Sequence, residues 1–401
     1  MHVLVLHRVP DSFARYAENI DHARHDVTYV HTADRAVTLP AAAVGGLRLE
    51  RPGQGDTADE VLDAIAGLPT PDVVVALSEY DLLAAGRLRD RLGLPGPSEA
   101  EVLPVRDKVV MKRAVAAAGL RVPRFLPLAE ALRRGPGGLG WQGATVLKPL
   151  AGASSEGVES FPDPATALAA GTDVAVGEYE VEEFVEGPIV HVDGLVVAGE
   201  LVAVVASEYV GTCLGFATGR PLGSVQTELD PALEDWSRRC LDALAVRDGP
   251  FHLEGIVTPD GPVFLELGAR FGGADVVDTF ELATGVRLPP AHVQLLVDGP
   301  IDPPRPRPTD PSARYGWFVL PGHTLGSTHC RVRGHERFRD DPLMLRWVER
   351  DPDEPISTTV TYADHLVPAA GLVGPGSTAQ LRAFLGALFE EVRVEPVGVT
   401  V

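Results

Sequence analysis

The chain has 401 residues, of which 45% are hydrophobic and 23% are charged. This length predicts about two to four globular domains, and the net charge of −21 disfavours nucleic acid or an anionic membrane as the main partner. Cys213, Cys240 and Cys330 have neither the spacing of a zinc site nor the density of a disulfide scaffold. With no signal-peptide pattern and no apolar run of about 20 residues, the sequence predicts a cytoplasmic protein that contacts no membrane.

Residues 1–105 alternate strands with helices. Residues 2–7 and 72–77 are short apolar strands, and the second ends at Ser78 and Glu79, where a helix with a leucine stripe begins. This alternation predicts a parallel sheet with helices packed on it, which is a Rossmann-like domain. No GxGxxG motif follows the first strand, so the sequence gives little support to dinucleotide binding.

Only three of the 35 basic residues are lysines, namely Lys108, Lys112 and Lys148. A lysine carries a compact point charge on a flexible stem, which suits phosphate. Lys108 lies in the first turn of a helix that Asp107 can cap, where the helix dipole disfavours a cation. We therefore regard Lys108 as a candidate for binding an anion, with an ordinary solvated lysine as the alternative.

Lys148 ends an apolar strand and precedes a loop from Gly152 to Gly157 with the sequence GASSEG. The backbone N–H groups of such a loop and the hydroxyls of Ser154 and Ser155 can wrap an anion. The position directly after a strand lysine favours a flap that covers phosphates. A plain flexible connection is the alternative.

Two apolar runs within residues 251–273 each carry one carboxylate, Glu254 and Glu266. The turn residues 259–261 (Pro-Asp-Gly) predict a hairpin with a three-residue loop, which pairs the two acids. Paired side chains lie about 4.5–5.5 Å apart at Cβ, and like charges there are destabilising. The apolar neighbours favour a cation between the acids, and Mg²⁺ fits because it binds through one or two carboxylates and substrate phosphates. The alternative is that the two acids lie on a solvent-exposed face and bind no ion.

The remainder of the chain predicts packing elements and a further unit. Residues 230–249 form a helix whose apolar side chains face a core, and the prolines of residues 300–311 favour an extended linker before a small α+β unit. His323, His329 and His335 are interpreted as surface residues, with a metal site as the minor alternative. The predicted domains are residues 1–105, 106–186, 187–300 and 301–401.

Taken together, these motifs resemble the ATP-grasp superfamily, particularly ligases of the L-amino acid ligase type, over about residues 1–300. The segments that carry the resemblance, in the family's order, are RDKVVMKRAVAAAG, VLKP, AGASSEGV, EEFVEG, HVDGLVV, HLEGIV and FLELGARFGG. The resemblance implies an α/β protein with the ATP-grasp fold. It also implies an N-terminal Rossmann-like domain, a small lobe with the flap, a large lobe with the hairpin, and a small C-terminal α+β domain.

The same resemblance implies a role for each residue of the site. ATP would be held at its phosphates by Lys108, Lys148 and the flap residues Gly152, Ser154, Ser155 and Gly157. The adenine would be held by Glu182 and by the backbone of Phe184 and Val185. Glu254 and Glu266 would bind two Mg²⁺ ions, and Arg270 would be the catalytic residue that neutralises charge on the transferred phosphoryl group.

Two positions depart from the family's pattern. Many members have a ribose-binding glutamate at a position that is Ile189 in this chain. Asp193 or His191 would then contact the ribose. The asparagine that often follows the second metal glutamate is here Gly268, so water would replace one oxygen ligand.

The resemblance implies an ATP-dependent ligase that activates a carboxylic acid, expected to be an amino acid, as an acyl phosphate and joins it to an amine. Its partners would be these small molecules, and homo-oligomerisation is left open. The alternatives are an ATP-grasp carboxylase, another acyl-phosphate-forming enzyme with a different acceptor, and a catalytically silent nucleotide-binding module. The presence of Arg270 beside both lysines and both acids favours an enzyme over a silent module.

Overall fold

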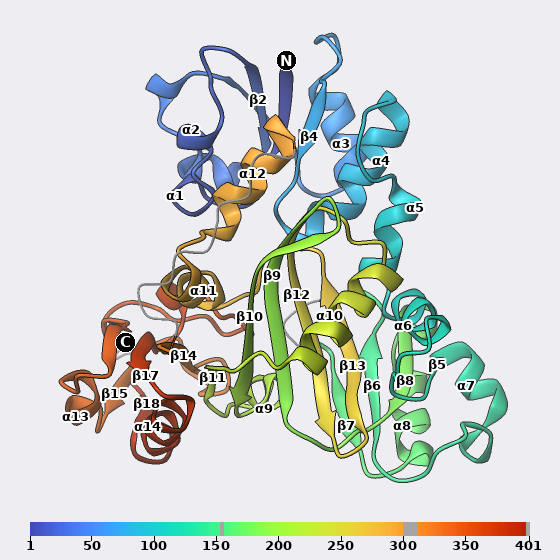
Figure 1. Cartoon of the computed structure of the whole chain (residues 1–401), viewed down its shortest axis with the longest axis vertical. Helices are drawn as coiled ribbons and strands as arrows, with labels where there is room; N and C mark the ends of the chain where they lie inside the picture. Colours follow the sequence, from blue (N-terminus) through green and yellow to red (C-terminus); the bar gives the residue numbers. More distant parts are fainter. Residues whose placement is uncertain (153–155, 300–311, 398–401) are drawn as a thin grey trace.

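Three main sheets carry the fold of the protein, shown as a computed structural model in Figure 1. The structure describes residues 1–152, 156–299 and 312–397. A parallel sheet is formed by the N-terminal segment, a small antiparallel sheet follows in the chain, and a large antiparallel sheet extends through the centre of the molecule to the C-terminal segment. Among the described helices, none is long and apolar enough to cross a membrane.

The N-terminal sheet is parallel, as predicted, and consists of β1 (His2–Leu6), β2 (Asp26–His31), β3 (Leu47–Glu50) and β4 (Val73–Val75) in the order β3-β2-β1-β4. Val3 and Val5 face one core, and Leu4 and Leu6 face another. The strands are therefore buried on both faces, as parallel strands usually are. The helices of this segment are α1 (Asp11–Ala14), α2 (Tyr16–Asn19), α3 (Thr57–Ala64), α4 (Leu82–Leu92) and α5 (Glu99–Val102).

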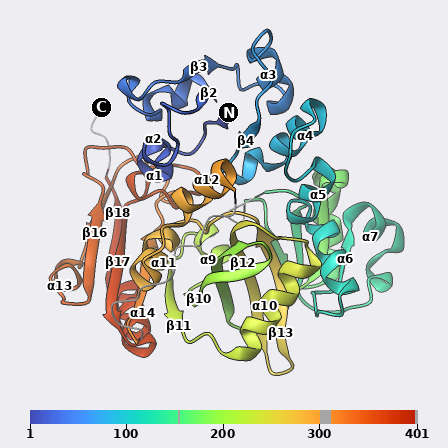
Figure 2. The same ribbon diagram turned by 45° about the horizontal axis from the view of Figure 1, so that its top comes forward.

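A helix from much later in the chain completes this domain. α12 (Leu288–Asp298) packs on the core of Val3 and Val5 through Leu288 and Val293, and it contacts α1, α2 and β4. Figure 2 shows α12, drawn in orange, against the blue N-terminal segment. Although the sequence places residues 288–298 in the predicted large lobe, their apolar face is buried on the N-terminal sheet.

The small sheet consists of β5 (Phe125–Pro127), β8 (Tyr179–Glu183), β6 (Thr145–Pro149) and β7 (Glu159–Phe161), paired antiparallel in that order. α7 (Leu128–Arg134) and α8 (Pro164–Ala170) pack on this sheet, whereas α6 (Lys108–Ala117) buries Met111 and Val115 in the core of the large sheet. Asp107 caps α6 as predicted, because its carboxylate accepts from the backbone N–H groups of Val109 and Val110. This cap sets Lys108 at the start of the helix.

The large sheet has eight strands. In spatial order they are β13 (Gly261–Gly268), β12 (Gly249–Thr258), β9 (Ile189–Val197), β10 (Glu200–Val210), β11 (Leu222–Thr227), β14 (Arg314–Leu320), β17 (Ala369–Gly376) and β16 (Met344–Glu349). The other elements are α9 (Cys213–Ala217), α10 (Pro231–Ala243), α11 (Val276–Thr284), α13 (Glu336–Arg339), α14 (Thr378–Glu391) and the pair β15 (Cys330–Arg333) and β18 (Arg393–Pro396). β11 pairs with β14, so the C-terminal strands continue the sheet of the preceding segment. The domain boundary at residue 300 stays a prediction.

The β12–β13 hairpin pairs Glu254 with Glu266, which confirms the predicted pairing of the acids. The predicted loop is wrong by one residue, because Thr258 pairs with Gly261 and not with Pro262. A bulge at Leu265 shifts the register by one between the turn and the acids. The shorter turn and the bulge each shift the register by one residue in opposite directions, so Glu254 still pairs with Glu266.

Candidate functional site

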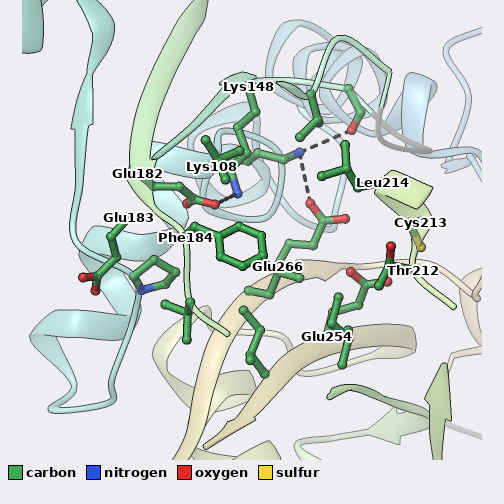
Figure 3. Close-up of a pocket in the computed structure, with 18 of the residues that line it drawn as sticks. Lys108, Lys148, Glu182, Glu183, Phe184, Thr212, Cys213, Leu214, Glu254 and Glu266 are labelled. Atoms are coloured by element: carbon green, nitrogen blue, oxygen red, sulfur yellow. Dashed lines mark hydrogen bonds and ion pairs between the residues drawn. The ribbon is translucent and has the colours of Figure 1, made fainter. Parts of the chain in front are cut away.

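A cavity of about 240 Å³ lies between the small sheet and the β12–β13 hairpin (Figure 3). Its wall changes from apolar to charged along the strands that form it, because alternate residues of a strand share one face. Val146 and Lys148 of β6 both line the cavity, as do Ile256 and Glu254 of β12. An apolar surface thus adjoins a charged one within a single cavity.

The charged part of the cavity holds both predicted phosphate lysines. Lys108 Nζ lies 3.2 Å from Glu266 Oε2 and donates to the Gly152 carbonyl oxygen at 3.5 Å (Figure 3). Burial alone would raise the pKa of Glu266, but Lys108 and Lys148 outweigh burial and lower it to about 2. Glu266 is therefore a carboxylate at neutral pH, held beside cations that an anionic ligand could also reach.

The oxygen donors of Glu254 and Glu266 fit Mg²⁺. Both side chains line the cavity from neighbouring strands, and both ligands are carboxylates of the hard type that this ion prefers. Lys108 is the cation that lies against Glu266. These residues could hold a divalent ion between the hairpin and a bound phosphate, as the sequence predicts.

Lys112 is a buried neighbour of the cavity residue Glu182 to which the sequence analysis assigned no role. It is fully buried, and its Nζ donates to Glu180 Oε1 at 2.6 Å and to Glu182 Oε2 at 2.5 Å. Lys148 Nζ contacts the other oxygen of Glu182, Oε1, at 2.7 Å. Two lysines and two glutamates thus form one buried cluster of balanced charge, in which Lys112 and Lys148 hold Glu182 from both sides. The only signal in the sequence is that Lys112 is one of three lysines.

The acid sensitivity of the protein should depend on Glu182. Burial alone would raise its pKa, but Lys112 and Lys148 lower it to about 2 from an ordinary value of 4.5. A lowered pKa stabilises the fold above the unfolded-state pKa, and this stabilisation is lost as the pH falls through the folded-state value. The difference in free energy of unfolding between wild type and Glu182→Gln should therefore be largest above pH 4.5 and shrink toward pH 2, as measured by urea unfolding across that range. For the control Glu130→Gln, on the surface, we expect a much smaller difference.

The predicted adenine contacts lie at the cavity. Glu182, Phe184 and Val185 all line it, and so does Ile189, the position at which the resemblance would place a ribose-binding glutamate. Of the predicted flap, Gly152 lines the cavity, whereas Ser154 and Ser155 lie outside the described residues. Gly157 has a φ of +69°, and a Cβ there would lie 3.1 Å from Pro149. This close approach favours glycine at the position where the chain returns to the small sheet.

The prediction that Asp193 contacts ribose is not supported. Asp193 is buried and does not line the cavity, and both of its oxygens accept hydrogen bonds, from His191 at 2.5 Å and from His252 at 2.7 Å. Burial alone would raise the pKa of Asp193, but the two histidines outweigh burial and lower it. Likewise Asp193 and Glu254 outweigh the effect of burial on His252 and raise its pKa to about 10. His191, the other candidate, is held in the same network.

Arg270 joins the hairpin to the N-terminal domain. Its Nε donates to Glu79 Oε2 at 2.6 Å, and Nη1 donates to the Phe271 carbonyl oxygen at 2.7 Å. Burial alone would lower the pKa of Arg270, but Glu79 and the hairpin acids raise it. Glu79 also pairs with Arg106. The sequence did not identify Glu79 as a partner, although an acid directly after a parallel strand lies at the carboxyl edge of the sheet, where ligand sites occur.

No family model matches the chain. It is 30% identical over 241 residues to an uncharacterized protein, y4rH, of Sinorhizobium fredii, covering 56% of this chain and 48% of that protein. It is 25% identical over 237 residues to the L-arginine-specific L-amino acid ligase of Bacillus subtilis, covering 54% of this chain and 55% of that protein. The chain thus spans about half the length of the curated relatives it matches.

Solved structures resemble almost the whole chain. The L-amino acid ligase of Bacillus licheniformis matches with a TM-score of 0.70 and 19% identity, covering 99% of this chain and 98% of that one. The phosphoribosylglycinamide synthetase of Anaerococcus prevotii (TM-score 0.65, 12% identity) and the N5-carboxyaminoimidazole ribonucleotide synthetase of Thermotoga maritima (TM-score 0.63, 15% identity) each match with 99% of both chains covered. The parallel and antiparallel sheets described above correspond to theirs, and the chain has the ATP-grasp fold.

Proposed function

We propose that the protein is an ATP-dependent ligase that activates a carboxylic acid as an acyl phosphate and joins it to an amine. The proposal rests on one observation: Lys108, Lys148 and the paired acids Glu254 and Glu266 line the same cavity, beside an apolar wall. That wall suits a purine ring, and the charged part suits a triphosphate. The fold and the relative named as an L-amino acid ligase support the same function.

In the first step, an oxygen of the acid would attack the γ-phosphorus of ATP. The bond from that phosphorus to the bridging oxygen breaks, and ADP and an acyl phosphate result. Such a step depends on positioning and charge neutralisation more than on covalent help from the protein. Lys108 and Lys148 would hold the phosphates, and Arg270 would face the transferred group. Glu254 and Glu266 would hold Mg²⁺, which supplies charge neutralisation when bound.

In the second step, the amine nitrogen would attack the acyl carbon and phosphate would leave. The amine loses one proton, so acid, amine and ATP yield an amide, ADP, phosphate and a proton. A closed cavity is an advantage here because water would otherwise hydrolyse the acyl phosphate.

A screen of amino-acid pairs for ATP-dependent phosphate release tests the proposal, and L-arginine is a first candidate because one relative is named for it. We expect release of ADP and phosphate to require a carboxylic acid, and the product to have the mass of acid plus amine less one water. Glu254→Gln serves as the control, and its residual release measures any contaminating ATPase. Release that needs bicarbonate instead of an amine would indicate a carboxylase. Tight nucleotide binding with no acid-dependent release would indicate a silent module.

A further inference from the structure

Six polar side chains lie on one face of four neighbouring strands of the large sheet. The register explains their proximity, because β9 and β12 each carry a histidine two residues before an acid and pair antiparallel. His191 therefore lies opposite Glu254, and Asp193 lies opposite His252. On β10 and β11, Tyr209 lies opposite Ser224. Histidine and acid thus alternate across the strand pair, directly beneath the proposed metal site.

These side chains form one continuous chain of hydrogen bonds. Ser224 Oγ and His191 Nε2 are 2.7 Å apart, and His191 Nδ1 donates to Asp193 Oδ2 at 2.5 Å. His252 Nδ1 donates to Asp193 Oδ1 at 2.7 Å, and its Nε2 donates to Glu254 Oε1 at 3.3 Å. Both partners of His252 are carboxylates, which only accept when ionised, so this ring donates from both nitrogens.

The chain of bonds ends on one oxygen of Glu254. Tyr209 donates its hydroxyl to the same atom, Oε1, at 2.7 Å. Within the described part of the protein, the hydrogen bonds to this carboxylate all go to Oε1. The carboxylate is thus oriented by two donors on one oxygen, and Oε2 is the oxygen available to a metal.

Glu254 lines the cavity, whereas the end of the network farthest from it lies in the protein interior. His191, Asp193 and Ser224 are each at most 2% exposed. A Cβ at Gly272 would lie 2.9 Å from Asp193 Oδ1, so the backbone closes over this carboxylate. A ligand from solvent cannot reach Asp193, and the group can act on the cavity only through His252 and Glu254.

We infer that His252 and Tyr209 are positioning residues that fix the Glu254 carboxylate for Mg²⁺, with Asp193 and His191 holding His252 in place. The inference rests on the proposed function, because it takes Glu254 as a metal ligand. Residues that hold a metal ligand typically contribute a factor of about 10–100 to metal affinity. A network that served only to satisfy a buried polar face would contribute to stability and leave metal affinity unchanged.

A second reading of the same residues is a metal ion bound by His191, Asp193 and His252, whose ligand atoms lie within 4.8 Å of one another. The hydrogen bonds of these residues argue against a bound metal ion. Both Nδ1 atoms already donate to Asp193, and a metal would have to replace both protons in a closed site. We therefore assign these three residues to the hydrogen-bonded network.

The test measures metal affinity and not turnover. Mn²⁺ is titrated into the full-length protein with a non-hydrolysable ATP analogue held just below the protein concentration, and free Mn²⁺ is followed by its EPR signal. Two variants at one position separate the two contacts of His252. In His252→Asn the side-chain amide nitrogen can replace Nδ1 and keep the hydrogen bond to Asp193. In His252→Gln it can replace Nε2 and keep the hydrogen bond to Glu254. We expect His252→Asn and Tyr209→Phe to weaken Mn²⁺ binding by a factor of about 10–100 and His252→Gln to weaken it less.

Ser224→Ala is the control, because Ser224 is buried like His252 but lies at the far end of the chain of bonds. It should lower the urea midpoint while changing Mn²⁺ affinity less than threefold, an effect we take as about the limit for a remote bond. If His252→Asn and Tyr209→Phe behave like Ser224→Ala, the network is only structural and the inference is wrong. A stoichiometric metal in the purified protein that is lost in Asp193→Asn would also overturn it.

The same titration separates this inference from the proposed function. If wild-type protein binds the Mn²⁺–nucleotide complex and the variants weaken it, the inference stands even if no ligase product is ever found. If wild type binds the complex and the variants bind it equally well, only the inference fails. If wild type binds no metal–nucleotide complex, both the proposed function and the inference fail.

Discussion

Replacing Arg270 with alanine is expected to lower acid-dependent ADP release by a factor of about 10²–10³, the usual effect of removing one preorganised donor from a site of developing charge. The expectation rests on position, because Arg270 lies four residues after Glu266 and just beyond β13, the strand that carries this proposed metal ligand. Its Nε and Nη1 are engaged by Glu79 and by the Phe271 carbonyl oxygen. The guanidinium group of Arg270 is therefore held in one orientation before any substrate binds.

A structural role for Arg270 predicts a different result. The ion pair with Glu79 connects the hairpin to the N-terminal domain, so a purely structural arginine should lower the melting temperature when it is removed and leave the folded fraction active. Asp275 and Asp278, the acids that follow Arg270 most closely in the sequence, both pair with Arg346 and not with Arg270. Glu79 is thus the residue whose variant distinguishes the two roles.

Glu79→Gln is the comparison variant, because it removes the ion pair with Arg270 and keeps the guanidinium, although it also removes the pair of Glu79 with Arg106. If Arg270 neutralises transferred charge, Glu79→Gln should retain far more turnover per folded molecule than Arg270→Ala, even though it removes two ion pairs of Glu79. Lysine at position 270 should rescue only partly, since a point charge cannot reproduce the bidentate fork. Equal turnover per folded molecule in Arg270→Ala and wild type would show that the arginine is structural. Melting curves and acid-dependent ADP release on the same preparations decide the matter.

The hairpin acids could be predicted because two local rules act on them. Turn residues fix where the chain reverses, and the two-residue period of a strand fixes which side chains share a face. The bulge at Leu265 could not be predicted, because a bulge inserts one residue without a signal in composition. The predicted pairing of Glu254 with Glu266 held only because the turn is also one residue shorter than expected.

Long-range contacts explain what the sequence did not provide. Glu79 and Arg270 are 191 residues apart, and Lys112 and Glu180 are 68 apart. No local pattern specifies which of several acids a distant cation will contact, whereas the packed fold selects one. The same holds for β14, whose pairing with β11 carries the large sheet past the proline-rich segment. Such pairings are decided by tertiary burial, which overrides local preference.

Replacing Lys112 with methionine is expected to lower the free energy of unfolding by about 3–5 kcal/mol, because breaking a buried ion pair leaves a charge uncompensated. Lys112 is 0% exposed, and its ammonium contacts Glu180 and Glu182 and lies 4.6 Å from the centre of the Phe125 ring. Without it, two carboxylates would face Lys148 alone. Methionine fills a similar volume, so lost charge and not lost packing should dominate the effect.

The double variant Lys112→Met with Glu180→Met separates the effect of unbalanced charge from the effect of altered packing. One cation and one anion remain in that cluster, and replacing a buried pair by apolar side chains of similar size is often close to neutral. Urea unfolding should therefore show the double variant to be more stable than Lys112→Met alone, although it carries one more substitution. Arg134→Ala, which removes a partly exposed pair with Glu130, should cost less than about 1 kcal/mol. If Lys112→Met costs no more than Arg134→Ala, or if the second substitution adds to the loss, the four charges do not act as a balanced cluster and Lys112 does not hold Glu182 beside Lys148.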